Sequence, residues 1–229
     1  QGLLTLQDVN LSNNTAAGGG GAIFSFGTGS TLTISNSNFD SNSANGPLGG
    51  GAIFNGSATT ITGSTLSNNA SASNGGAIAN LGSSSLILTE STVKGNNAAT
   101  GKGGGIYNTS TVSIVRSTIS GNLASDGGGL ANVNFSVSTS ASLLLATLSG
   151  NSATNRGGGI FSDGGTTTLI VDSTMAWNGA AASGGGIFRQ GTVTIGGSIL
   201  ATNTVGTTGP DIAGVLTSLG NNLIGSTSG

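Results

Sequence analysis

A repeat with a period of about 27 residues constrains the fold of this chain more than any other feature of its sequence. A run of glycines that leads into an apolar residue occurs seven times, as in GGGGAIFS at 18–25, and a worn eighth copy, PDIAG, stands at 210–214. Self-similarity at such a period is typical of a solenoid, in which each repeat packs only on its neighbours. The apolar anchors of the eight copies are Ile23, Ile53, Ile78, Ile106, Leu130, Ile160, Ile187 and Ile212.

A second motif, an apolar residue three positions before an asparagine, alternates with the glycine motif. Residues one period apart lie above one another in a solenoid, so we predict a ladder of side-chain amides that hydrogen-bond from coil to coil. A track of asparagines that binds glycans is the functional alternative. The asparagines of this motif are Asn14, Asn42, Asn69, Asn96, Asn122, Asn151, Asn178 and Asn203.

Each repeat also contains short segments in which apolar and polar residues alternate, such as STLTIS at 30–35 and TVTI at 192–195. This alternation predicts strands, and several strands within about 27 residues predict one coil of a parallel β-helix. We therefore expect an all-β fold with a single domain over 1–229, built of eight to nine coils. The coils are expected near 3–29, 30–57, 58–83, 84–110, 111–140, 141–164, 165–190 and 191–216, with a partial coil at 217–229.

Five of the twelve charged residues fall next to an opposite charge when the repeats are aligned. Glu90 and Arg116 share one column on adjacent coils, while Lys102, Asp126 and Arg156 alternate in sign in another. We predict ion pairs between the coils. Exposed pairs of this kind contribute only about 0–1 kcal/mol each, but a slip by one coil would unpair them.

Aromatic residues recur directly after the anchor, with opposite parity to the buried anchor itself. An outward stripe of this kind is a candidate contact surface for a partner or a sugar, unless the longer loop near 133–140 covers it. Trp177 stands in a column that otherwise holds small polar residues and is the best single candidate for a contact. The residues of the stripe are Phe24, Phe54, Tyr107, Phe161 and Phe188.

The composition disfavours several classes of function. The net charge is −2, with five Lys and Arg residues, so no basic patch predicts nucleic-acid binding. We expect no membrane span, because no apolar run has the required length. The chain contains no cysteine and no histidine, so thiolate metal sites are excluded and the most common general base is missing. We predict no cofactor, no metal and no catalytic residue.

Two alternatives to a structural protein stay open. Polysaccharide-binding and polysaccharide-degrading β-helices are the first, although no two outward acids fall on adjacent coils of one face, as paired carboxylates for glycoside hydrolysis would require. Ice binding is the second, because TLT at 31–33 and TVT at 192–194 fit a regular array that Ala58, Ile87, Ser140 and Leu169 interrupt. The acids considered are Asp8, Asp40, Glu90, Asp126, Asp163, Asp172 and Asp211.

The alternating motifs GGAI at 20–23 and 50–53 and FDSN at 39–42 resemble a known pattern. It is that of the right-handed parallel β-helix repeats of bacterial surface proteins, including polymorphic outer-membrane and autotransporter-like passengers. The tail VLTSLGNNLIGSTSG at 215–229 resembles the closing segment of secreted β-helix proteins. The resemblance implies a secreted protein at the bacterial surface with a structural or adhesive role and no catalytic residues.

The first and last copies of the repeat look like interior coils, without a capping helix or charged segment. Open solenoid ends invite pairing with another chain. We therefore expect either a processed piece of a longer rod or head-to-tail self-association into a filament or stalk outside the cell. A surface glycan, or a ligand on a host or neighbouring cell, is the further partner that such a protein predicts.

Overall fold

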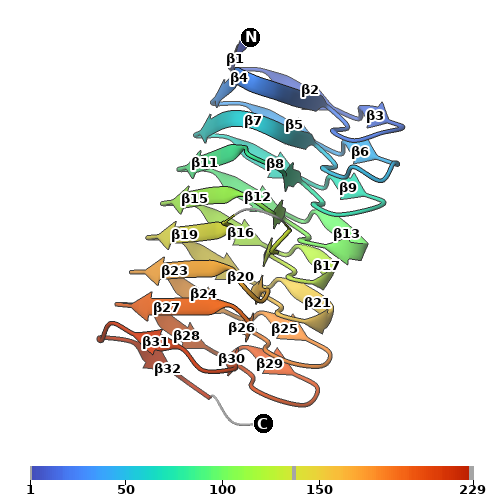
Figure 1. Cartoon of the computed structure of the whole chain (residues 1–229). Coiled ribbons are helices and arrows are strands. Elements are labelled where there is room, and N and C mark those ends of the chain that lie inside the picture. The colour runs from blue at the N-terminus through green and yellow to red at the C-terminus, as the bar shows by residue number, and fades with distance from the viewer. Residues whose placement is uncertain (1, 136–137, 227–229) are drawn as a thin grey trace.

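The computed structural model describes residues 2–135 and 138–226, and within them the chain forms a rod of stacked coils. The coils follow one another from the N-terminal end to the C-terminal end (Figure 1). Every strand pairs in parallel with the equivalent strand of the next coil, as Ile78 pairs with Ile106 and Leu88 with Ile114. The predicted all-β parallel helix, with about eight turns of about 27 residues, is confirmed.

Two sides of the rod belong to one 15-stranded sheet. The anchor side starts at each apolar anchor, and the long side follows it; β4 (Ile23–Ser35) and β7 (Ile53–Thr62) run through both. The later anchor-side strands are β10 (Ile78–Asn80), β14 (Ile106–Asn108), β18 (Leu130–Asn132), β22 (Ile160–Ser162), β26 (Ile187–Arg189) and β30 (Ile212–Ala213). The long-side strands are β1 (Leu3–Gln7), β11 (Ser85–Thr89), β15 (Thr111–Val115), β19 (Ser140–Leu144), β23 (Thr167–Val171), β27 (Thr192–Gly196) and β31 (Thr217–Ser218).

Two further sheets complete each coil. The short side holds β2 (Asn10–Ser12), β5 (Asn38–Asp40), β8 (Thr65–Ser67), β12 (Thr92–Lys94), β16 (Thr118–Ser120), β20 (Thr147–Ser149), β24 (Thr174–Ala176), β28 (Ile199–Ala201) and β32 (Leu223–Ile224). The fourth side holds β3 (Thr15–Ala16), β6 (Ser43–Ala44), β9 (Ala70–Ser71), β13 (Asn97–Lys102), β17 (Leu123–Asp126), β21 (Ser152–Arg156), β25 (Gly179–Ala180) and β29 (Thr204–Val205).

The core is a set of apolar columns that run the length of the rod. The columns read from the sequence, such as Ile34 on the long side, Leu66 on the short side and Ile78 on the anchor side, are buried. In the first coil Leu6 and Leu11 pack against the same cluster but are only partly buried. Each apolar residue therefore has its counterpart in the next coil as a neighbour, and burial depends on stacking.

The glycine three positions before each anchor makes a sharp turn. Gly103 and Gly127 have φ angles of 70° and 67°, in the left-handed region that favours glycine. A Cβ atom at Gly103 would also collide with the carbonyl oxygen of Ile106. The glycine motif is therefore the turn that delivers the anchor strand, and its recurrence has a steric cause.

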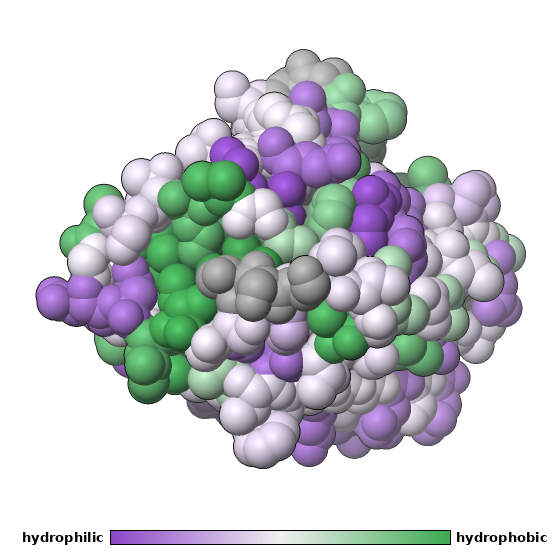
Figure 2. Space-filling view, turned by 90° about the horizontal axis from the view of Figure 1, so that it is seen from below, coloured by the Kyte–Doolittle hydropathy of each residue, from purple (hydrophilic) through white to green (hydrophobic). Residues whose placement is uncertain are grey.

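The first and last coils of the rod expose apolar side chains. Leu3 and Leu4 are exposed in the first coil, and Val215, Leu219 and Leu223 are exposed in the last. Seen along the rod from the C-terminal side, hydrophobic residues gather on that face (Figure 2). Contiguous apolar surface of this kind is typical of contact sites.

Candidate functional site

The predicted asparagine ladder runs through all eight coils. The Nδ2 atom of each rung donates to the Oδ1 atom of the next rung over 2.9 to 3.0 Å. Asn14 is exposed at the N-terminal end, whereas the seven later rungs are buried. The eight asparagines predicted from spacing are therefore brought together as one continuous structure.

Asn122 illustrates how completely a rung is satisfied. Its Nδ2 atom donates to the Val93 carbonyl (3.1 Å) and to Asn151 Oδ1 (2.9 Å). Its Oδ1 atom accepts from both the backbone N and the Nδ2 of Asn96, at 2.9 Å each. Because the side chain is fully buried and these four hydrogen bonds use its amide, this rung is structural. The alternative of a glycan-binding track finds no exposed amide here.

A second asparagine ladder, which the sequence interpretation missed, follows the anchor strands. Asn55 donates to Asn80 over 2.7 Å, Asn80 to Asn108 over 2.6 Å, and Asn108 to Asn132 over 2.8 Å. All four side chains are buried. The signal was present, because an asparagine follows the anchor by two positions in four successive copies of the glycine motif.

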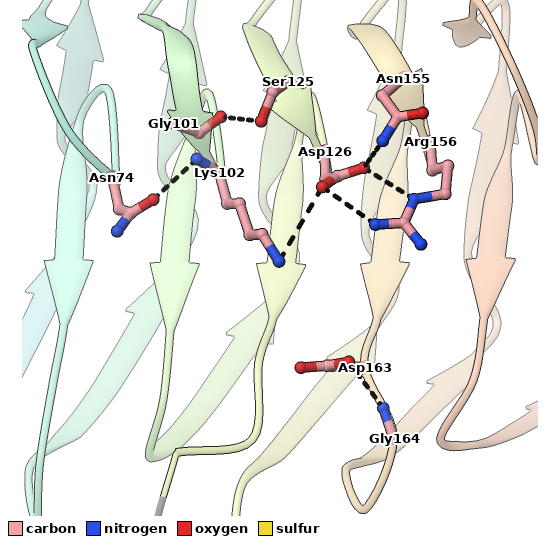
Figure 3. A network of polar contacts seen from close by, with 9 residues as sticks. All are labelled: Asn74, Gly101, Lys102, Ser125, Asp126, Asn155, Arg156, Asp163 and Gly164. Atoms are coloured by element: carbon pink, nitrogen blue, oxygen red, sulfur yellow. Dashed lines mark hydrogen bonds and ion pairs between the residues drawn. The ribbon is translucent and has the colours of Figure 1, made fainter.

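Both predicted groups of ion pairs form. Arg116 lies 2.8 Å from Glu90, with both side chains more than half exposed. Asp126 is buried. Its carboxylate forms ion pairs with Arg156 Nε (3.1 Å) and with Lys102 Nζ (3.9 Å). Asn155 also donates to Asp126, over 2.9 Å (Figure 3). The Asp126 carboxylate is thus the centre of a polar network that spans three coils.

The cations of this network lie against the aromatic stripe. The Arg156 guanidinium is 5.0 Å from the ring of Phe161 and 4.8 Å from that of Phe188, and Lys102 Nζ is 4.7 Å from Phe161. The rings of Phe161 and Phe188 stack at 5.6 Å. Contacts of cations with ring faces are attractive within about 6 Å. The cluster therefore joins the charge ladder to the aromatic column of the same coils.

This packing corrects the interpretation of the stripe as a free contact surface. Phe161 is 1% exposed and Phe54 5% exposed, so neither is available to a partner. Val133, in the loop after β18, packs with Phe161 and with the partly buried Tyr107 and Phe188. Val133, the first residue of the loop considered as the alternative, therefore covers this part of the column. Among the stripe residues Phe24 stays exposed, with its ring stacked on Phe54 at 4.5 Å.

Trp177 lies at a corner of the rod and is 68% exposed. Its φ angle is 60°, and glycine occupies the same corner at Gly95, Gly121 and Gly150. The left-handed conformation costs a non-glycine residue roughly 1–2 kcal/mol. An exposed indole at an unfavourable backbone position is consistent with a role in contact, and Trp177 remains a candidate for one.

A cleft of about 290 Å³ opens beside Tyr107. Leu48, Phe135 and Tyr107 supply its apolar lining, and Asn74 and Thr109 add polar groups. Burial, followed by the nearby Asp163 carboxylate, raises the pKa of Tyr107 above 10.0, so the phenol is neutral over the physiological range. The lining is uncharged and combines apolar side chains with a few polar groups, as the lining of a small-ligand site does.

Acidic residues are engaged by neighbours in several places. Hydrogen bonds from Ser67, Asn68 and Ser41 lower the pKa of Asp40 below 3.8, because each stabilises the charged carboxylate. Among the described residues no group of three or more acids could hold a metal ion.

No helix of residues 2–135 and 138–226 is long and apolar enough to cross a membrane.

The long side presents the outward residues considered for ice binding. Thr33 and Thr60 pair in register, as do Thr167 and Thr192. The interruptions predicted from the sequence are on the same face, where Ala58, Ile87 and Leu169 are exposed. The hydroxyl array is therefore broken in the structure as it is in the sequence.

Comparison with known proteins gives one match. Residues 8–25 and 146–163 match the Chlamydia polymorphic membrane protein repeat. Each matched segment contains a ladder asparagine, a glycine turn and an anchor, the arrangement found in every coil. No curated protein and no solved structure matches the chain. The fold makes the chain a parallel β-helix repeat protein, and two of its segments are similar to the Chlamydia polymorphic membrane protein repeat.

Proposed function

We propose that this protein is a non-catalytic rod that acts as a stalk, fibre or adhesive element outside the bacterial cell. The observation that supports this function best is the uninterrupted asparagine ladder, in which side-chain amides, seven of them buried, join all eight coils. Such a ladder resists slippage between coils, because a slip would unpair every buried amide. The match to a repeat of bacterial surface proteins supports the location.

A non-catalytic role also fits the use of the charged groups. Asp126 is neutralised by two cations, and Asp40 is held ionised by three hydrogen bonds. A general acid for glycoside hydrolysis needs a raised pKa and a second carboxylate at a defined distance. The test is incubation with a broad polysaccharide panel, in which we expect no release of sugar. Turnover that survives purification and is lost on mutation of an acid would contradict the proposal.

The adhesive part of the proposal assigns the contact to Trp177. Exposed aromatic side chains supply much of the binding energy at protein contacts. We expect immobilised protein to retain host or neighbouring cells, or a surface glycan, and the Trp177→Ala variant to retain fewer. Phe161→Leu, in the covered part of the stripe, is the matched control and is expected to bind as the wild type does. Equal retention by all three proteins would remove Trp177 from the contact.

Self-association through the end faces is the second part of the proposal. Exposed apolar residues at both ends and the unpaired outer edges of the first strands favour stacking of copies into filaments. Sedimentation and negative-stain microscopy over a concentration series test it. We expect rods that lengthen with concentration, whereas single rods at the highest concentration would refute it.

A neutral sugar ring in the Tyr107 cleft is a second candidate function. The cleft combines aromatic side chains with the amide of Asn74 and the hydroxyl of Thr109, which suits a ligand with an apolar face and a rim of hydroxyl groups. Calorimetric titration with neutral oligosaccharides tests it, and we expect Tyr107→Ala to abolish the heat signal. Binding that is unchanged in this variant would place the sugar elsewhere.

A further inference from the structure

The segment that joins the anchor side to the long side differs in length from coil to coil. Between the apolar anchor and the first paired residue of the long side, this connection is long at 24–30, 79–84 and 131–139 and short at 54–57 and 107–110. Because the strands before and after the connection pair in register, the extra residues of the long connections project from the rod. Each short connection therefore lies in a gap between two longer ones, and both gaps are bounded by coils within the chain.

The first gap is a cleft of about 600 Å³, which we call the Phe26 cleft. Gly56 and Ala58 line it from the short connection and the strand that follows, and residues 26–31 and 81–83 line it from the neighbouring coils. The ring of Phe26 lies over Gly56, since a Cβ atom at this glycine would come within 2.6 Å of Phe26 Cδ2. The missing side chain at Gly56 thus makes room for an aromatic wall.

The second gap is the Tyr107 cleft described above. Tyr107 and Thr109 belong to its short connection. Leu81 and Gly82 line this cleft as well as the Phe26 cleft, so the two clefts share one wall, the Leu81–Gly82 ridge. The backbone N of Gly82 donates to Thr109 Oγ1 over 3.4 Å, which ties the ridge to the next coil.

The two clefts have the same chemical character. Neither lining contains Asp, Glu, Lys or Arg, and each includes an aromatic side chain, Phe26 in one and Tyr107 in the other. Among the described residues, the hydroxyl groups of Thr28, Thr31 and Ser83 in the Phe26 cleft have no hydrogen-bond partner in the protein. A neutral sugar presents an apolar ring face and a rim of hydroxyl groups, so it matches both the aromatic rings and the free hydroxyls.

The spacing of the clefts suits a short sugar chain. Their short connections are two coils apart, which is roughly 10 Å along the rod at about 4.8 Å per coil. A pyranose ring lengthens a linear oligosaccharide by roughly the spacing of one coil. A trisaccharide therefore reaches from one cleft to the other with its middle ring over the Leu81–Gly82 ridge. Gly82 has no side chain, so the ridge is low where the middle ring crosses it.

We propose that the Phe26 cleft and the Tyr107 cleft are two subsites for one neutral linear oligosaccharide, a trisaccharide or longer, which runs along the rod across the Leu81–Gly82 ridge. The inference rests on the proposed sugar site in the Tyr107 cleft and adds to it a second subsite and a minimum chain length. Once one ring is bound, the second contact is intramolecular, so the affinity rises when the chain is long enough to reach both clefts.

Calorimetric titration with cello-oligosaccharides and N-acetylated chito-oligosaccharides, from the monosaccharide to the tetrasaccharide, tests the two subsites. We expect the wild type to bind the trisaccharide roughly tenfold more tightly than the monosaccharide, a factor equal to about 1.4 kcal/mol. Phe26→Ala is expected to remove this gain and to leave the binding of the monosaccharide in the Tyr107 cleft unchanged. Tyr107→Ala is expected to lose the binding of both sugars. Leu144→Ala, at an exposed position that lines neither cleft, is the matched control.

A second variant blocks the Phe26 cleft instead of removing its aromatic wall. Ala58 is an exposed residue of β7 that lines this cleft, and tryptophan is well accommodated on strands. Ala58→Trp is therefore expected to keep the circular dichroism of the wild type and to lose the same gain in affinity. It serves as the test if Phe26→Ala does not fold.

The outcomes separate this inference from the proposed sugar site on which it rests. If the trisaccharide binds no more tightly than the monosaccharide, or if its gain survives both Phe26→Ala and Ala58→Trp, the Phe26 cleft is not a subsite, while the Tyr107 site stands. Loss of the gain in Leu144→Ala would equally contradict the assignment to the Phe26 cleft. If none of these sugars binds, the proposed site and its extension fail together.

Discussion

A buried side-chain amide is the smallest unit that holds this rod together. Each rung both accepts and donates, so the cost of losing one depends on how many buried groups it leaves without a partner. Position along the rod changes this number while the residue type stays the same. The loss of unfolding free energy on removing one rung is therefore expected to differ between the middle of the ladder and its end.

Asn122→Ala is expected to destabilise the protein strongly. The substitution leaves the Val93 carbonyl and the backbone N–H of Asn96 unpaired in the interior, and each such group costs about 1–3 kcal/mol. Asn14→Ala, at the exposed end of the same ladder, is the matched control and is expected to cost much less. Chemical denaturation of both variants measures the difference. Equal losses would show that the ladder adds little beyond packing.

Tyr107 offers a direct optical test of its environment, because it is the only tyrosine in the chain. Its pKa is raised above 10.0 by burial and by Asp163, so the folded state holds the phenolic proton more tightly than the unfolded state does. The resulting stability is present below the unfolded pKa and is lost as the pH rises through the folded pKa. We expect tyrosinate absorbance to appear above pH 10.0, and an ordinary titration midpoint would contradict this.

At the scale of elements, strands of adjacent coils are joined by side-chain ion pairs in addition to their backbone hydrogen bonds. The network around Asp126 ties β13, β17 and β21 together and is backed by the rings of β22 and β26. The Glu90–Arg116 pair joins adjacent coils at an exposed corner. The two arrangements contain the same types of charge and differ in burial.

Asp126→Asn is therefore expected to cost more stability than Glu90→Gln. An exposed pair contributes roughly 0–1 kcal/mol, whereas removing one partner of a buried pair costs roughly 3–5 kcal/mol. The cations of Asp126 are about 30% exposed, since the side chains of Lys102 and Arg156 retain 34% and 29% of their surface. We expect a value between these limits from urea unfolding at low salt. A smaller effect than that of Glu90→Gln would show that the cluster is held by packing alone.

At the scale of the whole molecule, the rod should tolerate the removal of a complete coil. Deletion of residues 70–96 joins Asn69 to Asn97, which pairs in register with Ala70 in the intact chain. Both the apolar columns and the ladder then continue without a gap, because contacts in a solenoid are with neighbouring coils. We expect a folded, shorter rod by circular dichroism and microscopy.

Deletion of half a coil is the control for this experiment. Removing residues 70–83 places strands of different sides in sequence and turns apolar columns outward, since register decides which face is buried. The half-coil variant is expected to aggregate or remain unfolded. If it folds as well as the full-coil variant, the coils are not the modular unit of this protein.

Much of the fold and part of the candidate site could be predicted because they depend on periodicity. The columns that contain Asn122, Glu90 and Asp126 can be predicted by counting the residues between repeats. Each of these residues contacts the neighbour in its column that the count predicts. The Asn55 ladder was equally periodic and could have been found. The covering of Phe161 could not, because it depends on where a single non-repeating loop turns.

The sequence by itself determined the architecture, because a repeat places equivalent residues in the same environment eight times. The positions of the core, the turns and the ladder follow from this. The three-dimensional packing decided what is free to act. It buried Phe54 and Phe161, left Trp177 exposed, formed the cleft beside Tyr107, and brought Asp211 onto the last rung. These features arise where the repeat is interrupted. There the exposure of a side chain depends on contacts between unlike segments, which a periodic pattern does not contain.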